Sequence, residues 1–168
     1  MTARRSAWIA VLLVLLVGLL AQATMASAGT SNILKADTMV GIPDAFTGTQ
    51  APLRGLNGGG IPWQLNAAKV VLTSDGHLTI KVEGLVLAAG GAAGTNPISS
   101  FRAVVSCLQS DTSVLNLTTD PFPATTGAAI DGGGNAKFEG DVSLPHPCIA
   151  PIVFVTSPGS AWFASTGA

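Results

Sequence analysis

Histidine and charged side chains are scarce in this chain of 168 residues. Charged residues make up 10% of the sequence, against about 25% in an average soluble domain. The only histidines are His77 and His146, too few for a copper–zinc centre of the dismutase kind, which needs a cluster of imidazole ligands. His77 lies beside a predicted turn and His146 stands between two prolines, so we expect both to be exposed or corner residues rather than metal ligands.

The common signatures of catalysis are also missing. No Gly-x-Ser-x-Gly motif occurs, and a Ser–His–acid triad would have to use one of the two histidines. Glycosidases need two facing carboxylates, whereas the two glutamates, Glu83 and Glu139, fall on the polar side of predicted strands. The sequence therefore favours a non-enzymatic protein. An exported hydrolase that works through carboxylates is the alternative.

The N-terminus has the pattern of a cleavable signal peptide. Two arginines precede an uncharged, apolar run over residues 8–20, and Ala26-Ser27-Ala28 has the small-x-small form of a cleavage site. The run is shorter than the ~20 apolar residues of a membrane-spanning helix, and no charged cluster follows it. We predict a signal peptide over residues 1–28, with cleavage after Ala23 as an alternative, and one β domain over residues 29–168.

The predicted mature chain is mildly acidic. Residues 29–168 keep six of the eight basic residues and all nine acidic ones, so their net charge is near −3. This charge argues against binding to nucleic acid and to anionic lipid, and we expect no membrane attachment after signal cleavage. A surface with so few charges repels other copies weakly, which favours self-association or a place on the cell surface. We expect a secreted or cell-surface location, no cofactor and a partner that the sequence does not identify.

Both cysteines, Cys107 and Cys148, lie in the predicted mature domain. An even number of cysteines in an exported protein predicts a disulfide. The bond would close a loop of about 42 residues and stabilise the fold by roughly 4 kcal/mol through the entropy of the unfolded chain. Two separate buried thiols are the alternative.

Alternation of apolar and polar residues predicts short β-strands, and helical periodicity is nearly lacking. Residues 69–73 and 77–82 are two such runs around Asp75-Gly76, a strong signal for a hairpin. A second hairpin is predicted around residues 131–135, with a return strand over residues 136–144.

Four further runs of apolar or β-branched residues predict strands, at residues 101–107, 114–119, 152–155 and 161–164. The segments 36–66 and 88–97 are rich in glycine and proline, so we expect long loops there, with a strand near residues 38–42. Many short strands joined by such turns predict an all-β fold. The expected architecture is a small β-sandwich, immunoglobulin-like or related, or a barrel, with one intrachain disulfide.

A glycine-rich loop offers one candidate ligand site. No Lys-Ser/Thr follows the three glycines at 58–60, so the loop is not of the phosphate-binding kind. Arg54, Asn57 and Trp63 flank it, and a guanidinium and an aromatic ring beside flexible backbone form a candidate contact for a small ligand or glycan. A structural loop, with Trp63 in the core, is the favoured alternative.

A third hypothesis is a calcium-stabilised module. Asp131, Asn135 and Asp141, together with Glu139, offer the oxygen ligands that calcium prefers. Their spacing matches no EF-hand loop, and Asp-Gly-rich sequences are also typical of ordinary turns, which is the favoured interpretation.

Several segments of the mature region resemble those of an uncharacterised group of small exported bacterial proteins. They are residues 54–63, 95–98, 101–107, 122–126, 147–155 and 161–164. The resemblance implies export and a single domain, and it assigns no functional residue. Taken together, the sequence predicts a secreted or cell-surface, non-enzymatic β domain that binds, adheres or assembles.

Overall fold

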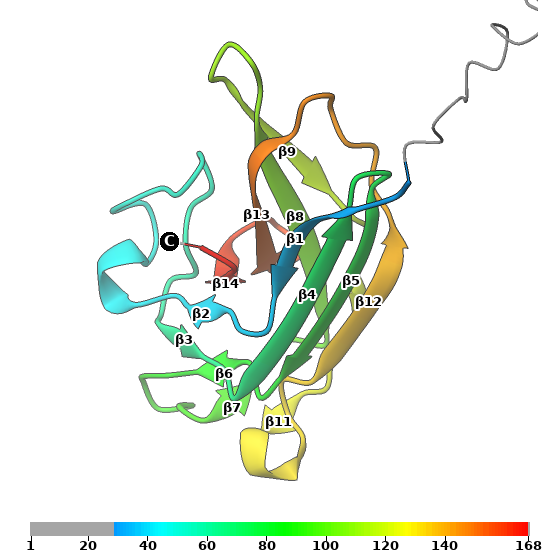
Figure 1. The fold of residues 1–168 in the computed structure, drawn as a ribbon. Coiled ribbons are helices and arrows are strands. Elements are labelled where there is room, and N and C mark those ends of the chain that lie inside the picture. The colour runs from blue at the N-terminus through cyan, green and yellow to red at the C-terminus, as the bar shows by residue number, and fades with distance from the viewer. Residues whose placement is uncertain (1–28, 168) are drawn as a thin grey trace, which may run out of the picture.

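The computed structural model describes residues 29–167, so the predicted signal peptide lies outside the described residues. Within that range the chain forms β-strands of two to nine residues and two single-turn 3-10 helices, Asp44–Phe46 (η1) and Ala129–Asp131 (η2). No helix within residues 29–167 is long and apolar enough to cross a membrane. The predicted all-β fold is confirmed (Figure 1).

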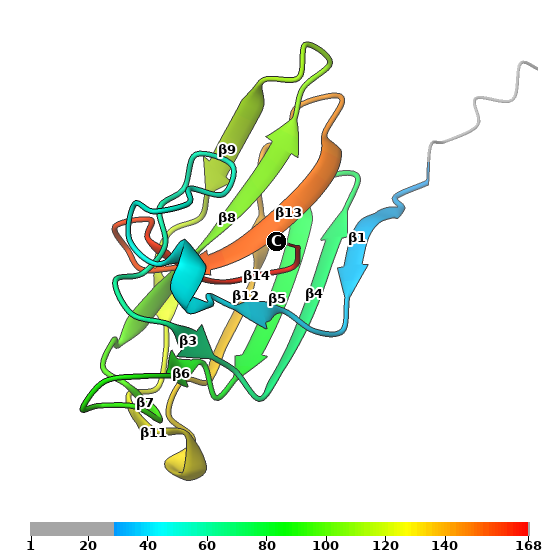
Figure 2. The same ribbon diagram turned by 90° about the vertical axis from the view of Figure 1, so that its left-hand side faces the viewer.

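Two antiparallel sheets face each other as a β-sandwich (Figures 1 and 2). The first sheet has the order β1-β4-β5-β12, with bounds Asn32–Ala36, Ala67–Thr73, His77–Glu83 and Ala136–Asp141. The second has the order β10-β8-β13-β14-β2, with bounds Phe122–Pro123, Ser100–Leu108, Ile149–Thr156, Trp162–Ser165 and Val40–Gly41. A further strand, β9 (Val114–Thr118), pairs with β8 beside β10.

Two short ribbons close one end of the sandwich (Figure 1). One joins β3 (Trp63–Gln64) to β6 (Val86–Leu87), and the other joins β7 (Thr95–Asn96) to β11 (Gly127–Ala128). The predicted loop segments therefore contain short paired stretches, and β2 lies where a strand near residues 38–42 was expected.

The core lies between the two sheets and is built from alternate positions of their strands, because successive side chains of a strand point to opposite faces. From the first sheet it takes Val70, Leu72, Leu78, Ile80 and Val82. From the second it takes Phe101, Ala103, Val105, Val153 and Val155. Each of these side chains is almost completely buried, which for a large aliphatic residue stabilises the fold by about 1.5–3 kcal/mol.

The first predicted hairpin is confirmed. Strands β4 and β5 pair in register, with Leu72 opposite Leu78 and Val70 opposite Ile80. Gly76 in the turn has φ = 95°, and a Cβ there would lie 2.1 Å from the carbonyl oxygen of Val142. Glycine is needed at this position both for the left-handed backbone and for the close approach of the neighbouring chain.

The prediction of the second hairpin gave β12 the wrong partner strand. β12 pairs along its whole length with β5, from Ala136 opposite Val82 to Asp141 opposite His77. Only one isolated bridge joins β12 to the chain that precedes the turn, between Ala124 and Ala136. Alternation identified which residues of this strand face inward, but the pairing partner depends on how the sandwich closes.

The predicted disulfide is confirmed. Cys107 and Cys148 are bonded, with their Cα atoms 4.9 Å apart. The bond joins the inner face of β8 to the residue directly before β13. These two strands also pair with each other, so the bond reinforces the centre of the second sheet.

The second sheet is covered on its outer face as well. Residues 43–62 cross this face, and Figure 2 shows the segment in front of the sheet. The ring of Phe46 packs edge-on against that of Trp162 at 6.2 Å between centroids, and Phe154 packs against Trp162 at 5.8 Å. Trp162 and Val104 are therefore fully buried although they point away from the core between the sheets. This cover explains why β13 is apolar on both faces, as expected for a central strand.

Candidate functional site

The exposed outer face of the first sheet carries most of the cationic side chains. All four lysines of residues 29–168 are on its strands, where they alternate with buried or half-buried positions: Lys35, Lys69, Lys81 and Lys137. The remaining cationic side chains of that range, Arg54 and Arg102, are half-buried. The first sheet therefore carries most of the cationic side chains of the domain, together with three carboxylates, those of Glu83, Glu139 and Asp141.

Three of these lysines form a row across neighbouring strands, here called the lysine row. Lys69 of β4 is directly opposite Lys81 of β5, and Lys81 is directly opposite Lys137 of β12. Neighbouring strands are about 4.8 Å apart, and like charges placed directly opposite each other are destabilising. The repulsion among these lysines therefore lowers the stability of the fold, and a surface with only a structural role would not require it.

Ion pairs relieve part of this repulsion. Lys81 pairs with Glu83 on the same strand, and the Nζ of Lys137 lies 3.2 Å from a carboxylate oxygen of Glu139. Among residues 29–167 no carboxylate lies within ion-pair distance of Lys69. All these pairs are exposed and weak in water, so the lysines can exchange them for another anion.

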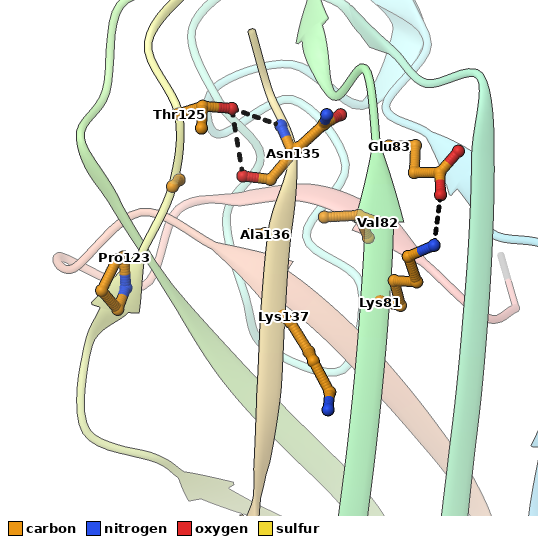
Figure 3. Close-up of a pocket in the computed structure, with 9 residues that line it drawn as sticks. Lys81, Val82, Glu83, Pro123, Thr125, Asn135, Ala136 and Lys137 are labelled. Carbon is orange, nitrogen blue, oxygen red and sulfur yellow. Dashed lines mark hydrogen bonds and ion pairs between the residues drawn. The ribbon is translucent and has the colours of Figure 1, made fainter. Parts of the chain in front are cut away.

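A hollow of about 590 Å³ borders the lysine row, between the start of β12 and the chain that leaves β10 (Figure 3). It is open to solvent, and Val82, Pro123, Ala124 and Ala136 supply its apolar part. Its polar part comes from the following side chains: Lys81, Glu83, Thr125, Asn135 and Lys137. An open hollow of this kind, with two lysines and one glutamate around an apolar surface, suits an extended ligand better than a small enclosed one.

The turn before β12 is held by hydrogen bonds beside this hollow. The hydroxyl of Thr125 accepts a bond from the backbone N–H of Asn135 at 2.9 Å (Figure 3). The side-chain oxygen of Asn135 accepts a bond from the backbone N–H of Gly84 at 2.9 Å. Its amide nitrogen has no hydrogen-bond partner among residues 29–167 and remains a donor for a ligand oxygen.

Acidic groups gather at the other end of the same face. The Nδ1 of His77 lies 2.9 Å from an oxygen of Asp141, and its Nε2 lies 3.9 Å from an oxygen of Glu139. The hydrogen bond with Asp141, and then the charges of Asp141 and Glu139, raise the pKa of His77 above its usual value. Glu83 and Glu139 point outward as predicted. Glu139 and Asp141 lie on the exposed face of the sheet, and Glu83 lies at the opposite end of β5, where it lines the hollow.

The structure does not bring Arg54, Asn57 and Trp63 into one site. Trp63 is 5% exposed, and its ring stacks on Phe163 at a centroid distance of 4.1 Å, in the core. Arg54 lies in the segment over the outer face of the second sheet and donates a hydrogen bond from Nη2 to the carbonyl of Ala150 at 3.1 Å. Asn57 is exposed. The structure therefore places Trp63 in the core, as the alternative interpretation proposed.

The candidate calcium ligands are also spread out. Asp131 belongs to η2. Asn135 directly precedes β12 and Asp141 ends it, so that these two residues are roughly 20 Å apart at ~3.4 Å per residue. Asp141 is engaged with His77. Among the described residues, no group of three or more His, Cys, Asp or Glu side chains is arranged to hold a metal ion. His146 is exposed at the corner before Cys148.

Sequence reasoning missed the lysine row, although part of its signal was present. Lys69 and Lys81 are equally distant from Asp75 in the predicted turn, so the hairpin register places them opposite each other. The third member, Lys137, could not be found in this way because its strand was assigned to another partner.

Comparisons of the chain with protein-family models, with curated proteins and with solved structures found no match. The resemblance to small exported bacterial proteins stays a prediction.

Proposed function

We propose that this protein is a secreted or cell-surface, non-enzymatic domain that binds an anionic polymer along the lysine row. The observation that carries the proposal is the placement of Lys69, Lys81 and Lys137 directly opposite one another beside an open hollow. A ligand with several negative charges offsets the repulsion among the three lysines. Each lysine then contributes favourably to the free energy of binding.

The geometry of the face favours an acidic polysaccharide over nucleic acid. The row crosses the strands at steps of about 4.8 Å, and the apolar surface of the hollow beside it offers contact to the carbon skeleton of a sugar. Nucleic acid requires a larger basic surface. The cluster of His77, Asp141 and Glu139 limits the extent of the basic surface around the lysine row. We therefore propose an acidic polysaccharide as the ligand class.

An extracellular setting agrees with this ligand. A stable disulfide indicates a non-reducing compartment, and the Cys107–Cys148 bond is the only cysteine pair that the chain can form. The N-terminal sequence pattern supports export by a signal peptide. Acidic polysaccharides are extracellular materials, so the proposed location and ligand are consistent.

Binding to polygalacturonate, measured by isothermal titration calorimetry at low ionic strength, tests the proposal. We expect the variant K69Q/K81Q/K137Q to lose binding, and K35Q to keep it because Lys35 lies on the same face outside the row. We expect the native protein to bind more weakly in 1 M salt, where the screening length falls to about 3 Å. Equal binding by the triple variant and by K35Q, or no binding by the native protein, would contradict the assigned site.

A further inference from the structure

Strand β9 forms a free edge of the second sheet. It pairs with β8 over five consecutive residue pairs without a register shift. The other outer strands of the two sheets are protected: β1 has an irregular register and carries Lys35, β10 contains Pro123 and leads into the bridge to β12, β12 carries Lys137, Glu139 and Asp141, and β2 is only two residues long. β9 carries no charge, no proline and no register shift, which are among the devices that prevent a sheet edge from pairing with another chain, and its central side chain, Asn116, donates a hydrogen bond to the carbonyl of Arg54.

The hydrogen-bond pattern shows which backbone groups of β9 face outward. The N–H of Gln109 donates to the carbonyl of Ser113, and the N–H of Thr119 donates to the carbonyl of Ala103. Bonded and non-bonded positions alternate along an antiparallel pair, so the odd-numbered residues of β9 bond to β8. The N–H and C=O groups of Val114, Asn116 and Thr118 therefore point away from β8, toward the free edge.

The side chains of β9 have the same order of shapes when the strand is read in either direction. The sequence from residue 114 to residue 118 is Val-Leu-Asn-Leu-Thr, and valine and threonine have the same branched shape. The strand contains no charge and no proline. Two copies of such a strand, placed antiparallel about a two-fold axis at Asn116, match each side chain with one of the same shape.

We propose that β9 pairs with β9 of a second copy in this register, so that the second sheets of two chains form one continuous sheet. Asn116 then faces Asn116 of the second copy, with mutual backbone hydrogen bonds. Leu115 faces Leu117 of the second copy, and Val114 faces Thr118 of the second copy. An interface that uses the same strand of both chains is the isologous contact expected of a two-fold dimer.

Surface chemistry at the edge supports a second copy as the occupant. The apolar row of Val114, Leu108 and Ile149 reaches this edge, and Val114 and Ile149 are 43% and 45% exposed. β9 itself carries no charged side chain, and Asp111 and Asp120 lie in the loops outside the strand. No like charges are therefore placed opposite each other, and the outward backbone groups find partners.

Two matched double variants test the register, with the mass in solution measured by sedimentation equilibrium over a range of concentrations. In V114K/T118K a lysine faces a lysine of the second copy twice, so we expect the dimer to weaken at least about tenfold. In V114K/T118E a lysine faces a glutamate of the second copy at both places, so we expect the dimer to persist. Both substituted positions are exposed, and equal urea unfolding midpoints for the two variants at a concentration where both are monomeric confirm that each folds.

Each outcome decides the proposal. A native protein of dimeric mass that V114K/T118K alone converts to the mass of one chain supports the register. A native protein that stays monomeric at its highest attainable concentration overturns the proposal. Equal dimerisation of the two variants places the contact elsewhere and overturns it too. K69Q/K81Q/K137Q should dimerise like the native protein, which separates this interface from the proposed ligand site.

Discussion

Trp63 stacks on Phe163 with 4.1 Å between the ring centroids, at the end of the core between the two sheets. Replacing it with alanine removes a large buried ring, so we expect W63A to lower the free energy of unfolding by about 3–5 kcal/mol. N57A, at an exposed position on the same segment, should leave stability nearly unchanged. Urea unfolding measures both, and a W63A variant as stable as the native protein would show that the ring does not support the core.

The Cys107–Cys148 bond links residues 41 apart in sequence, and its loss should be visible in the unfolding equilibrium. We expect the double variant C107A/C148A to be less stable by roughly 4 kcal/mol, mainly because the unfolded chain gains entropy. Adding reductant should destabilise the native protein in urea and should not affect the variant. A native protein with the same unfolding midpoint in both redox conditions would contradict this role.

The contact between His77 and Asp141 predicts a pH dependence. Because the folded protein holds the pKa of His77 above its usual value of about 6.5, the protonated imidazole favours the folded state. This contribution is fully present below pH ~6.5 and is lost as the pH rises through the folded-state pKa. An NMR titration should show the raised pKa of His77, and D141N should lower it further than E139Q does. Equal titration curves for the native protein and D141N would disprove the assignment.

Gly134 allows a close approach of two chain segments. Its φ is +77°, and a Cβ at this position would lie 2.3 Å from the carbonyl oxygen of Leu85. We expect G134A to destabilise the protein by more than about 1 kcal/mol. G91A is the matched control, because a Cβ at Gly91 meets nothing within 4 Å, and it should change stability by less than about 0.5 kcal/mol. Thermal unfolding compares the two, and equal melting temperatures would refute the close contact.

Much of the fold could be predicted because it depends on local sequence patterns or, for the disulfide, on the single pairing that two cysteines allow. Residues that alternate along a strand point to opposite faces, so the buried side of β5 was readable from Leu78, Ile80 and Val82. The Asp75-Gly76 turn identified the β4–β5 hairpin because adjacent strands joined by a tight turn must pair. Cys107 and Cys148 could form only one bond within the chain.

The candidate site was less predictable because it depends on which strands become neighbours. The sequence by itself determined the all-β character, the inward and outward faces and the pairing of Lys69 with Lys81. Only the tertiary structure placed Lys137 in the same row, because β12 pairs with β5 through a contact between residues far apart in the chain. It also decided that Trp63 belongs to the core while Arg54 lies over the second sheet. Local patterns specify the faces of an element, whereas its neighbours follow from how all the apolar faces are buried at once.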